Sequence, residues 1–388
     1  MTSLDDRAKH ALNKSIVPDL DSEIPPLDKL TTTKTLEVRE ARYVSSYIAQ
    51  YVQLDNRILF IKSLSSDVEM YTLDEALDRF PDLVQRYSWK ALPVDLDRFT
   101  ALSHLKRVGG YFIRVKPGAK ISIPIQTCFF MSGGYQIVKN IVVVERGAEA
   151  VIVTGCSIAP EVLGLHVSTT EIYLEEGAKL IDVTIHSWNR VTHVRSRKGV
   201  VLGRNSTYVS YYLNFASANT LHAYFKSALE GEGSRSVLMD VVLGRDHAKY
   251  SLETQALLQG TESSAELVSK LLARDEARIS ARLRIEAYAD RSRGYTECSA
   301  LMLSPRSIIN TIPELVSYNN SSELHHEASI GKLRDEELEY LQLKGFNQRE
   351  AVSILVRGFI QLDLSFLSAE LRKSLDAILD AIAKASSS

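Results

Sequence analysis

The sequence has few cysteines, and their spacing excludes two familiar kinds of site. Among 388 residues there are only three, Cys128, Cys156 and Cys298, and none belongs to a C-x-x-C pair. A small secreted domain that is stabilised by disulfides needs an even number of cysteines at a higher density. A structural zinc site needs closely spaced Cys and His ligands. The sequence therefore predicts neither a disulfide framework nor a self-contained zinc site.

Long apolar runs and an excess of one charge are also missing. The best candidate for a membrane span, residues 351–367, is interrupted by Arg357 and Asp363 and falls short of the roughly 18 apolar residues required. Lys and Arg number 46 against 48 Asp and Glu, a formal net charge of -2, which argues against a general nucleic-acid binder. Residues 1–6 lack the basic and then apolar pattern of a signal peptide. We expect a cytoplasmic protein that binds neither membranes nor nucleic acid.

Several motifs of common enzymes are absent too. The sequence contains no G-x-x-x-x-G-K-[ST] motif, so it has no nucleotide-binding P-loop of its own. It also lacks G-x-S-x-G, H-E-x-x-H and G-x-G-x-x-G motifs. These absences favour a protein that is not itself an enzyme.

What the sequence does contain is a repeat. Lys116-Pro117-Gly118-Ala119-Lys120 recurs as Glu145-Arg146-Gly147-Ala148-Glu149 and as Glu175-Glu176-Gly177-Ala178-Lys179. Weaker members begin at Gly203, Gly231, Gly244 and Ala273. Taking Gly118, Gly147, Gly177, Asn205 and Gly233 as equivalent gives steps of 29, 30, 28 and 28 residues. A fixed period of this length predicts a solenoid.

The segments between these turns are apolar or alternating and rich in β-branched residues, so each predicts a strand. Strands stacked turn upon turn form a parallel β-helix. We place this all-β core at residues 108–330, with a mostly helical region at 1–107 and a helical domain at 331–388. The repeat fades after Leu303, so we place the final rung near Ile279–Met302.

Local signals predict the flanking elements. The sequence favours a strand at 57–61, and the predicted helices are 36–52, 73–80 capped by Thr72, one following Pro81, 97–107, one from Asp335, one opened by Asn347 and Glu350, and 369–385.

One candidate site emerges from spacing. Cys298 is followed 27 residues later by His325-His326-Glu327, a separation close to one solenoid period. Thiolate, imidazole and carboxylate brought together would suit iron better than a hard cation. Arg291 and Arg293 would then supply a positive field that favours the thiolate. The alternatives are a buried structural cysteine with a capping histidine, and arginines that belong to a solvated turn.

From Pro81 to its end, the chain resembles the SufB/SufD family of iron–sulfur cluster assembly proteins. The matching segments include Gly155-Cys156-Ser157-Ile158-Ala159-Pro160, Leu165-His166, Glu171-Ile172-Tyr173, His186-Ser187-Trp188, Tyr295-Thr296-Glu297-Cys298 and His326-Glu327-Ala328-Ser329. The resemblance implies a right-handed parallel β-helix with helical ends, which agrees with the repeat.

The resemblance also implies a role and partners. Members serve as scaffolds for a transient iron–sulfur cluster, and SufB pairs with SufD. They also bind SufC, an ABC-type ATPase. We expect the C-terminal helices to form the contact with this ATPase. Cys298 and Glu327, with His326 beside them, fall on positions used for cluster formation at the subunit interface, and Cys156 on the cysteine that receives sulfur. A homodimer or a heterodimer with a paralogue, a sulfur donor and apoprotein acceptors are therefore expected.

Three alternatives remain open at this point. His326-Glu327-Ala328 is SufB-like, whereas the chain's length and Leu303-Ser304-Pro305 are SufD-like. A SufD-like role would make the chain a metal-free structural subunit of the same complex. A carbohydrate-active β-helix is the remaining possibility, but the sequence shows neither the aligned carboxylates and aromatics nor the secretory signal that it usually needs.

Overall fold

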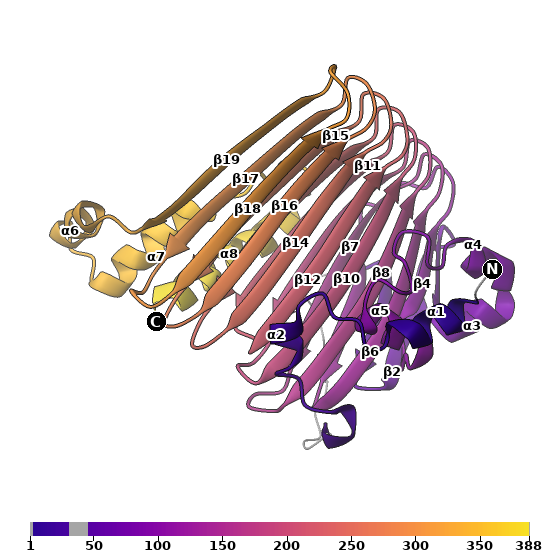
Figure 1. Cartoon of the computed structure of the whole chain (residues 1–388), viewed down its shortest axis with the longest axis horizontal. Helices are drawn as coiled ribbons and strands as arrows, with labels where there is room; N and C mark the ends of the chain where they lie inside the picture. The colour runs from indigo at the N-terminus through magenta and orange to yellow at the C-terminus, as the bar shows by residue number, and fades with distance from the viewer. Residues whose placement is uncertain (1–2, 31–45, 388) are drawn as a thin grey trace.

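The protein is a two-sheeted parallel β-solenoid. A computed structural model describes residues 3–30 and 46–387. Within these residues the chain winds alternately through a ten-stranded sheet and a nine-stranded sheet that face one another (Figure 1). Beyond the first strands of each sheet, each turn of the winding adds one strand to each sheet, in parallel with the strand of the turn before. The predicted all-β parallel helix with helical ends is confirmed.

The elements have the following bounds. The ten-stranded sheet contains, in spatial order, β19 (Glu323–Lys332), β17 (Arg293–Met302), β15 (Ser264–Ala273), β13 (Arg235–Gly244), β11 (Thr207–Ala216), β9 (Lys179–Ser187), β7 (Glu149–Ile158), β5 (Ile125–Met131), β1 (Ala49–Leu54) and β2 (Arg57–Ser63). The nine-stranded sheet contains β18 (Ile308–Ser317), β16 (Arg278–Ala287), β14 (Lys249–Leu258), β12 (Thr220–Leu229), β10 (Thr192–Leu202), β8 (Gly164–Leu174), β6 (Gly134–Val144), β4 (Tyr111–Val115) and β3 (Val68–Thr72). The helices are α1 (Leu4–Ala11), α2 (Pro18–Asp21), η1 (Leu27–Lys29), α3 (Leu73–Arg79), α4 (Pro81–Arg86), α5 (Arg98–Leu105), α6 (Asp335–Leu343), α7 (Gln348–Phe359) and α8 (Ala369–Ser387). From β4 onward successive turns pair in parallel, whereas β2 and β3 pair antiparallel with β1 and β4 respectively.

The predicted corner residues lie at equivalent positions of successive turns. Gly118, Gly147, Gly177, Asn205 and Gly233 have φ values of 70, 66, 68, 53 and 65°. This left-handed conformation costs glycine little. The backbone N–H of Gly147 donates to the Glu176 carbonyl at 2.8 Å, and that of Gly177 donates to the Arg204 carbonyl at 2.8 Å. Consecutive corners are therefore hydrogen-bonded to one another, as the repeat predicts.

Two members of the predicted series belong to the other corner of the solenoid. The turn at 244–247 joins β13 to β14, and the turn at 273–276 joins β15 to β16, whereas the glycine corners lead from the nine-stranded to the ten-stranded sheet. Asp246 and Asp275 have φ values of 56 and 58°. Both corners need a tight turn with one left-handed residue, so similar short motifs arise at each. Treating them as one series was wrong.

The predicted position of the final rung was also wrong. Ile279–Met302 covers β16 and β17, but β18 and β19 add a further turn beyond them. The sequence did not predict this turn, because Pro305 and Pro313 interrupt the strand pattern there. Pro305 lies in a corner, and Pro313 lies in β18, the terminal strand of its sheet, where a missing N–H is tolerated. The solenoid therefore ends at β18 and β19, which present an open edge.

Helix signals were accurate where a cap was present. Thr72, Asp97 and Asn347 each accept a hydrogen bond from the first turn of α3, α5 and α7 respectively, and each forms a capping box.

The predicted helix 36–52 is contradicted in the part that the structure describes. Its residues 36–45 lie outside the described part, and 49–52 belong to β1, which pairs with β5 and β2. Pairing with the first open strand of the solenoid outweighs local helix propensity here.

Buried ion pairs attach the N-terminal region to the nine-stranded sheet. Arg195 and Arg197 are fully buried on β10. The Arg195 Nε atom donates to Asp21 at 2.8 Å, and Arg197 donates to Asp97 through Nε at 2.8 Å and Nη2 at 2.6 Å. Burial would raise the pKa of Asp97, but the charge and hydrogen bonds of Arg197 outweigh burial and hold that pKa below its usual value.

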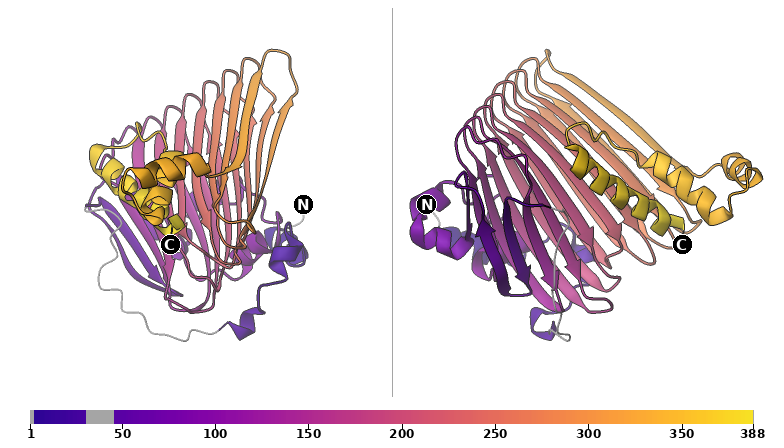
Figure 2. Two further views of the ribbon diagram at one scale, coloured as in Figure 1. Left: turned by 90° about the vertical axis from the view of Figure 1, so that its left-hand side faces the viewer. Right: turned by 180° about the vertical axis from the view of Figure 1, so that it is seen from behind.

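The C-terminal helices cover the outer face of the ten-stranded sheet. Apolar residues of α7 and α8 form one cluster with outward-facing residues of β9, β11 and β13, and Figure 2 shows α8 lying over the outer face of this sheet. The Tyr211 hydroxyl donates to the Asp363 carbonyl at 2.7 Å. The N- and C-terminal regions thus cover opposite sheets and leave the interior and the β18–β19 edge as places for a site.

Breaking one buried ion pair should destabilise the protein strongly. Asp97→Ala leaves the Arg197 guanidinium buried without its carboxylate, and we expect a loss of about 3–5 kcal/mol in the free energy of unfolding, measured by urea denaturation. Asp95→Ala is the matched control, because Asp95 pairs with Arg7 at the surface, where an ion pair contributes little. Equal losses of stability for the two variants would contradict the structural role of the buried Arg197–Asp97 ion pair.

Candidate functional site

In-register pairing creates rows of side chains along the inside of the solenoid, spaced by about 4.8 Å. One inward row of the ten-stranded sheet is unusually polar. In order it contains Thr127, Thr154, Thr184, Tyr212, Asp240, Ser269, Cys298 and Ala328. A neighbouring inward row begins with Phe129, Cys156, His186 and Asn214. Two of the three cysteines therefore point into the interior, on adjacent rows.

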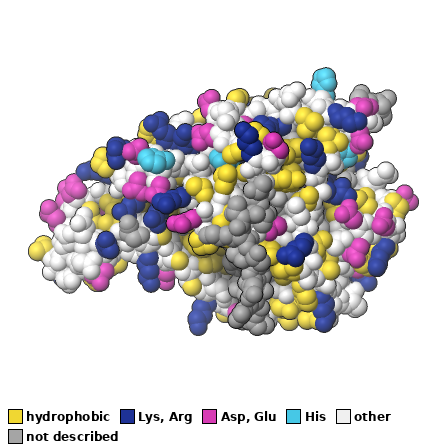
Figure 3. Space-filling model, turned by 90° about the horizontal axis from the view of Figure 1, so that it is seen from below, with side chains coloured by type: hydrophobic (Ala, Val, Ile, Leu, Met, Phe, Trp, Pro, Cys, Tyr) yellow, Lys and Arg dark blue, Asp and Glu magenta, His cyan; other side chains and the backbone are white. Residues whose placement is uncertain are grey.

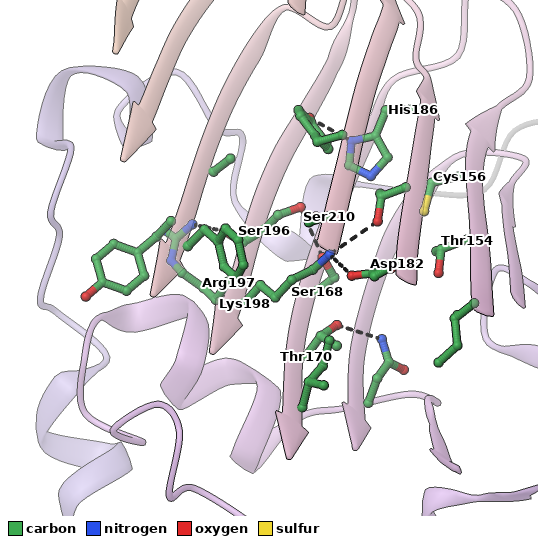
Figure 4. A pocket seen from close by; sticks show the side chains of 18 of the residues that line it. Thr154, Cys156, Ser168, Thr170, Asp182, His186, Ser196, Arg197, Lys198 and Ser210 are labelled. Atoms are coloured by element: carbon green, nitrogen blue, oxygen red, sulfur yellow. Dashed lines mark hydrogen bonds and ion pairs between the residues drawn. The ribbon is translucent and has the colours of Figure 1, made fainter. Parts of the chain in front are cut away.

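Part of this interior is a cavity of about 90 Å³. Cys156, His186 and residues of both sheets line it (Figure 4). Lys198 reaches in from β10, and its Nζ donates to Asp182 Oδ2 at 2.6 Å. The Tyr208 hydroxyl donates to the same carboxylate oxygen at 2.7 Å. The lining of the cavity is mostly apolar with a few charged and polar groups, and the cavity has room for a few water molecules or a small ligand.

Asp240 lies between this cavity and Cys298. It lines the cavity and precedes Ser269 and Cys298 in the polar row. Burial raises the pKa of Asp240 to about 7, against the opposing influence of Lys198. A buried carboxyl group that titrates near neutral pH marks a candidate functional position.

Cys298 lies one strand inside the open edge. Its side chain is 1% exposed. Burial raises the pKa of its thiol to about 11, and Asp240 and Glu297 add to this effect. The expected positive field is not found, because Arg291 pairs with Glu262 and Arg293 lies beside Glu323 at the surface. For the arginines, the alternative of a solvated turn holds.

His326 and Glu327 lie on the neighbouring strand, as the one-period spacing predicts. The pairing of β17 with β19 places Ala328 beside Cys298, His326 beside Thr296 and Glu327 beside Glu297. Side chains alternate along a strand, so His326 shares the face of Cys298 while Glu327 points from the opposite face. Among the residues that the structure describes, no three His, Cys, Asp or Glu side chains converge as a metal site. The described part of one chain therefore does not assemble a complete ligand set.

Cys156 is remote from this edge. It is buried on β7, five strand spacings from Cys298 on β17, or about 24 Å at the usual distance between strands. Its register neighbour His186 shares a hydrogen bond with the Tyr212 hydroxyl at 3.0 Å. This bond joins the row of Cys156 to the row of Cys298. Cys128, which the sequence places in the core, is also fully buried.

Sequence analysis missed the interior charged residues. Asp182 and Asp240 alternate with apolar residues in the same way as surface residues do, and Lys198 follows the charged segment Arg195-Ser196-Arg197. Whether each residue falls on the inward or the outward face of its strand was therefore the only signal. Counting from the corner glycines would have placed them on the inward face. The polar interior follows from the register of the strands and not from any local motif.

Comparison with known proteins identifies similar chains. Residues 129–359 match the family described as SUF system FeS cluster assembly, SufBD core domain. The chain is 34% identical over 337 residues to an iron-sulfur cluster assembly SufBD family protein of Methanothermobacter thermautotrophicus, covering 85% of this chain and 82% of the relative. A protein of the same description from Archaeoglobus fulgidus is 33% identical over 326 residues, covering 84% and 88%. The iron-sulfur cluster assembly protein SufB of Bacillus subtilis is 26% identical over 351 residues, covering 87% and 74%.

Two surface properties accompany these matches. Within residues 3–30 and 46–387, no helix combines the length and apolarity needed to cross a membrane. On the face shown in Figure 3, basic and acidic side chains are interspersed. That face therefore presents no extended surface of one charge.

The Cys298 thiol should react slowly in the folded protein. The thiolate is the nucleophile, and the raised pKa of about 11 leaves little of it at neutral pH. The rate at which a polar reagent alkylates Cys298 should rise about tenfold for each pH unit, at pH values below that pKa. Peptide mass mapping measures this rate. Labelling at neutral pH as fast as in the urea-unfolded chain would contradict the buried position.

Proposed function

Because the chain belongs to the SufBD family of iron–sulfur cluster assembly proteins, we propose that it is a scaffold on which a nascent cluster is built and then passed to apoproteins. The observation that carries this proposal is the position of Cys298, one strand inside an open solenoid edge with His326 and Glu327 on the edge strand. The cluster is cargo, held transiently and released.

The edge is suited to a second subunit. β18 and β19 end their sheets, and almost every side chain of β19 is exposed. An unpaired strand edge of ten residues invites pairing with another chain, and two like edges pair with two-fold symmetry. A second copy or a SufBD paralogue would bring its own edge to the seam. Each subunit then contributes part of the ligand set that one chain lacks.

The proposed ligands favour release. Cys298 supplies a thiolate, His326 an imidazole and Glu327 a carboxylate, and such a mixed set holds iron–sulfur clusters less firmly than four thiolates. Binding to iron requires loss of the thiol proton. Glu327 points away from Cys298 within one chain, so its role depends on the partner subunit's approach.

Sulfur would enter at Cys156. This role comes from the family resemblance, and the polar interior supports it. The cavity beside Cys156 reaches Asp240, and Ser269 and Cys298 follow Asp240 in the same row. A sulfur donor would load Cys156, and sulfur would leave for the edge site.

The C-terminal helices would bind a SufC-type ATPase, which supplies the ATP hydrolysis that this chain's motifs do not. Helices α6 and α7 and the turn between them carry exposed apolar side chains: Tyr340, Leu343, Phe346 and Ile354 are 60, 87, 42 and 42% exposed. Exposed apolar clusters on a soluble protein mark interaction sites. Nucleotide-driven movement of the partner would open or close the β18–β19 seam.

A metal-free, SufD-like subunit of the same complex is the second candidate. The raised pKa of Cys298 and its acidic neighbours favour it, because a thiol that stays protonated binds iron poorly. The two candidates differ in whether Cys298 is required for a cluster.

Cys298→Ala should abolish cluster retention without unfolding the protein, because alanine is tolerated at this buried position beside Ala328. Anaerobic reconstitution with iron and sulfide, followed by gel filtration and absorption and Mössbauer spectroscopy, measures retained cluster. Glu327→Ala should lower retention less, because the thiolate and imidazole remain.

Cys128→Ala is the matched control, since Cys128 is equally buried but far from the edge, and it should retain cluster like the parent. A Cys298→Ala protein that retains cluster at the parental level would refute the scaffold site and favour the SufD-like role.

Removing an exposed apolar side chain from α6 should weaken ATPase binding. Leu343→Glu should raise the dissociation constant for a SufC-type ATPase at least about tenfold, as expected for an interface anchor, by isothermal titration. Leu64→Glu, also at an exposed apolar site, should leave the dissociation constant unchanged. Truncation after Ile330 should abolish binding, and a folded truncated protein that bound normally would exclude the C-terminal helices.

A further inference from the structure

His166 is a buried imidazole in the same part of the interior as Cys156. It lies on β8 with no exposed surface and lines the cavity together with Cys156. Its ring centroid is 6.1 Å from that of Phe129, the register neighbour of Cys156, and 4.9 Å from that of Trp188. Neither of these aromatic contacts occupies the ring nitrogens.

The hydrogen bonds of Gln136 determine the tautomer of His166. The Gln136 amide nitrogen donates to the backbone carbonyls of Asp55 at 2.8 Å and Phe130 at 3.3 Å. This fixes the amide so that its oxygen lies 3.0 Å from His166 Nδ1. A carbonyl oxygen only accepts hydrogen bonds, so Nδ1 carries the proton. The other nitrogen, Nε2, therefore presents a lone pair.

That lone pair has no hydrogen-bond partner among the described residues. An unsatisfied buried acceptor costs free energy and calls for an explanation. Burial also lowers the pKa of His166 to about 3, so the imidazole is neutral unless an anion forms beside it. The chain thus maintains an unoccupied base in the lining of the same cavity as a buried thiol.

The other titratable groups that line the cavity have partners that His166 Nε2 lacks, or lie farther along the sheet. Besides Cys156 and His166, the titratable groups that line the cavity are Tyr111 on β4, Asp182 and His186 on β9, Arg197 and Lys198 on β10, Tyr212 on β11, Tyr224 on β12 and Asp240 on β13. His186 Nδ1 is engaged by the Tyr212 hydroxyl, and Asp182 is engaged by Lys198 and Tyr208. Asp240 lies three strands from β7 in its sheet.

We propose that His166 Nε2 accepts the proton of the Cys156 thiol when that thiol takes up sulfur, an inference that rests on the proposed sulfur-receiving role of Cys156. The Cys156 sulfur attacks the terminal sulfur of a small persulfide, R–S–SH, where R is hydrogen or an organic group. A new S–S bond forms at Cys156, and the S–S bond of the donor breaks. Its electron pair leaves with R–S⁻.

The proton of Cys156 passes to His166 Nε2 and then to R–S⁻, giving R–SH. The overall reaction converts one thiol and one persulfide into another persulfide and another thiol, with no net oxidation. The imidazolium exists beside a developing sulfur anion, which offsets the cost of burying its charge. Gln136 acts through His166 as a positioning residue, because it keeps Nε2 free.

Sulfur uptake by a chain with one cysteine tests this inference. In a Cys128→Ala/Cys298→Ala background, sodium disulfide is added anaerobically, and intact mass spectrometry follows the gain of one sulfur atom at Cys156. His166→Phe should take up sulfur about a hundredfold more slowly near neutral pH, as loss of a general base predicts. This ratio should shrink as the pH rises, because hydroxide then removes the thiol proton.

Gln136→Leu is the second variant. It keeps the imidazole but releases Nδ1, so uptake should slow by a smaller factor. Thermal unfolding and near-UV circular dichroism of each variant report on folding.

The outcomes separate the two proposals. A single-cysteine parent that gains no sulfur overturns both the role of Cys156 and the inference. A parent that gains sulfur while His166→Phe gains it equally fast, or more slowly by a factor independent of pH, overturns the inference alone. If His166→Phe does not fold, Gln136→Leu decides, and an unchanged rate in that variant overturns the inference.

Discussion

The in-register hydrogen bonding of each turn to the next is the constraint on which the rest of the structure depends. Because every strand from β4 to β17 pairs in parallel with the strand one turn farther along the chain, residues 27 to 30 positions apart become direct neighbours. Side chains then form inward and outward rows that run the length of the molecule. The polar row that ends at Cys298 and the row that contains Cys156 exist only because this register is maintained. The same pairing leaves an unsatisfied edge at β19, where the solenoid ends.

The solenoid buries charge in two places, with different consequences. Arg195 and Arg197 are paired with Asp21 and Asp97 and attach the N-terminal region to one sheet. All of these groups have partners, which is the usual condition for burying a charge. The interior differs, because Asp240 shares a cavity with the Lys198–Asp182 pair and His166 Nε2 has no partner within residues 3–30 and 46–387. The first arrangement is structural, whereas the second leaves groups available for chemistry.

The predictability of these features follows from how local their causes are. Corner glycines and capping residues such as Thr72 and Asn347 act within a few residues, so the sequence alone revealed the repeat and most of the helices. The final turn escaped detection because Pro313 is tolerated only at a sheet edge, which depends on the whole sheet. β1 was missed because its pairing with β5 is distant in sequence. Cys298, His326 and Glu327 were found by spacing, but the division of their side chains between two faces emerged only from the register.

The central claim is that a cluster forms only where two solenoid edges meet, because one chain does not bring a sufficient set of ligands together. Native mass spectrometry of the anaerobically reconstituted protein tests it directly, by reading the number of chains and the bound iron and sulfide in the same ion. The account predicts that iron and sulfide appear on paired subunits and that the monomer carries neither. Monomers that carry an intact cluster would contradict it.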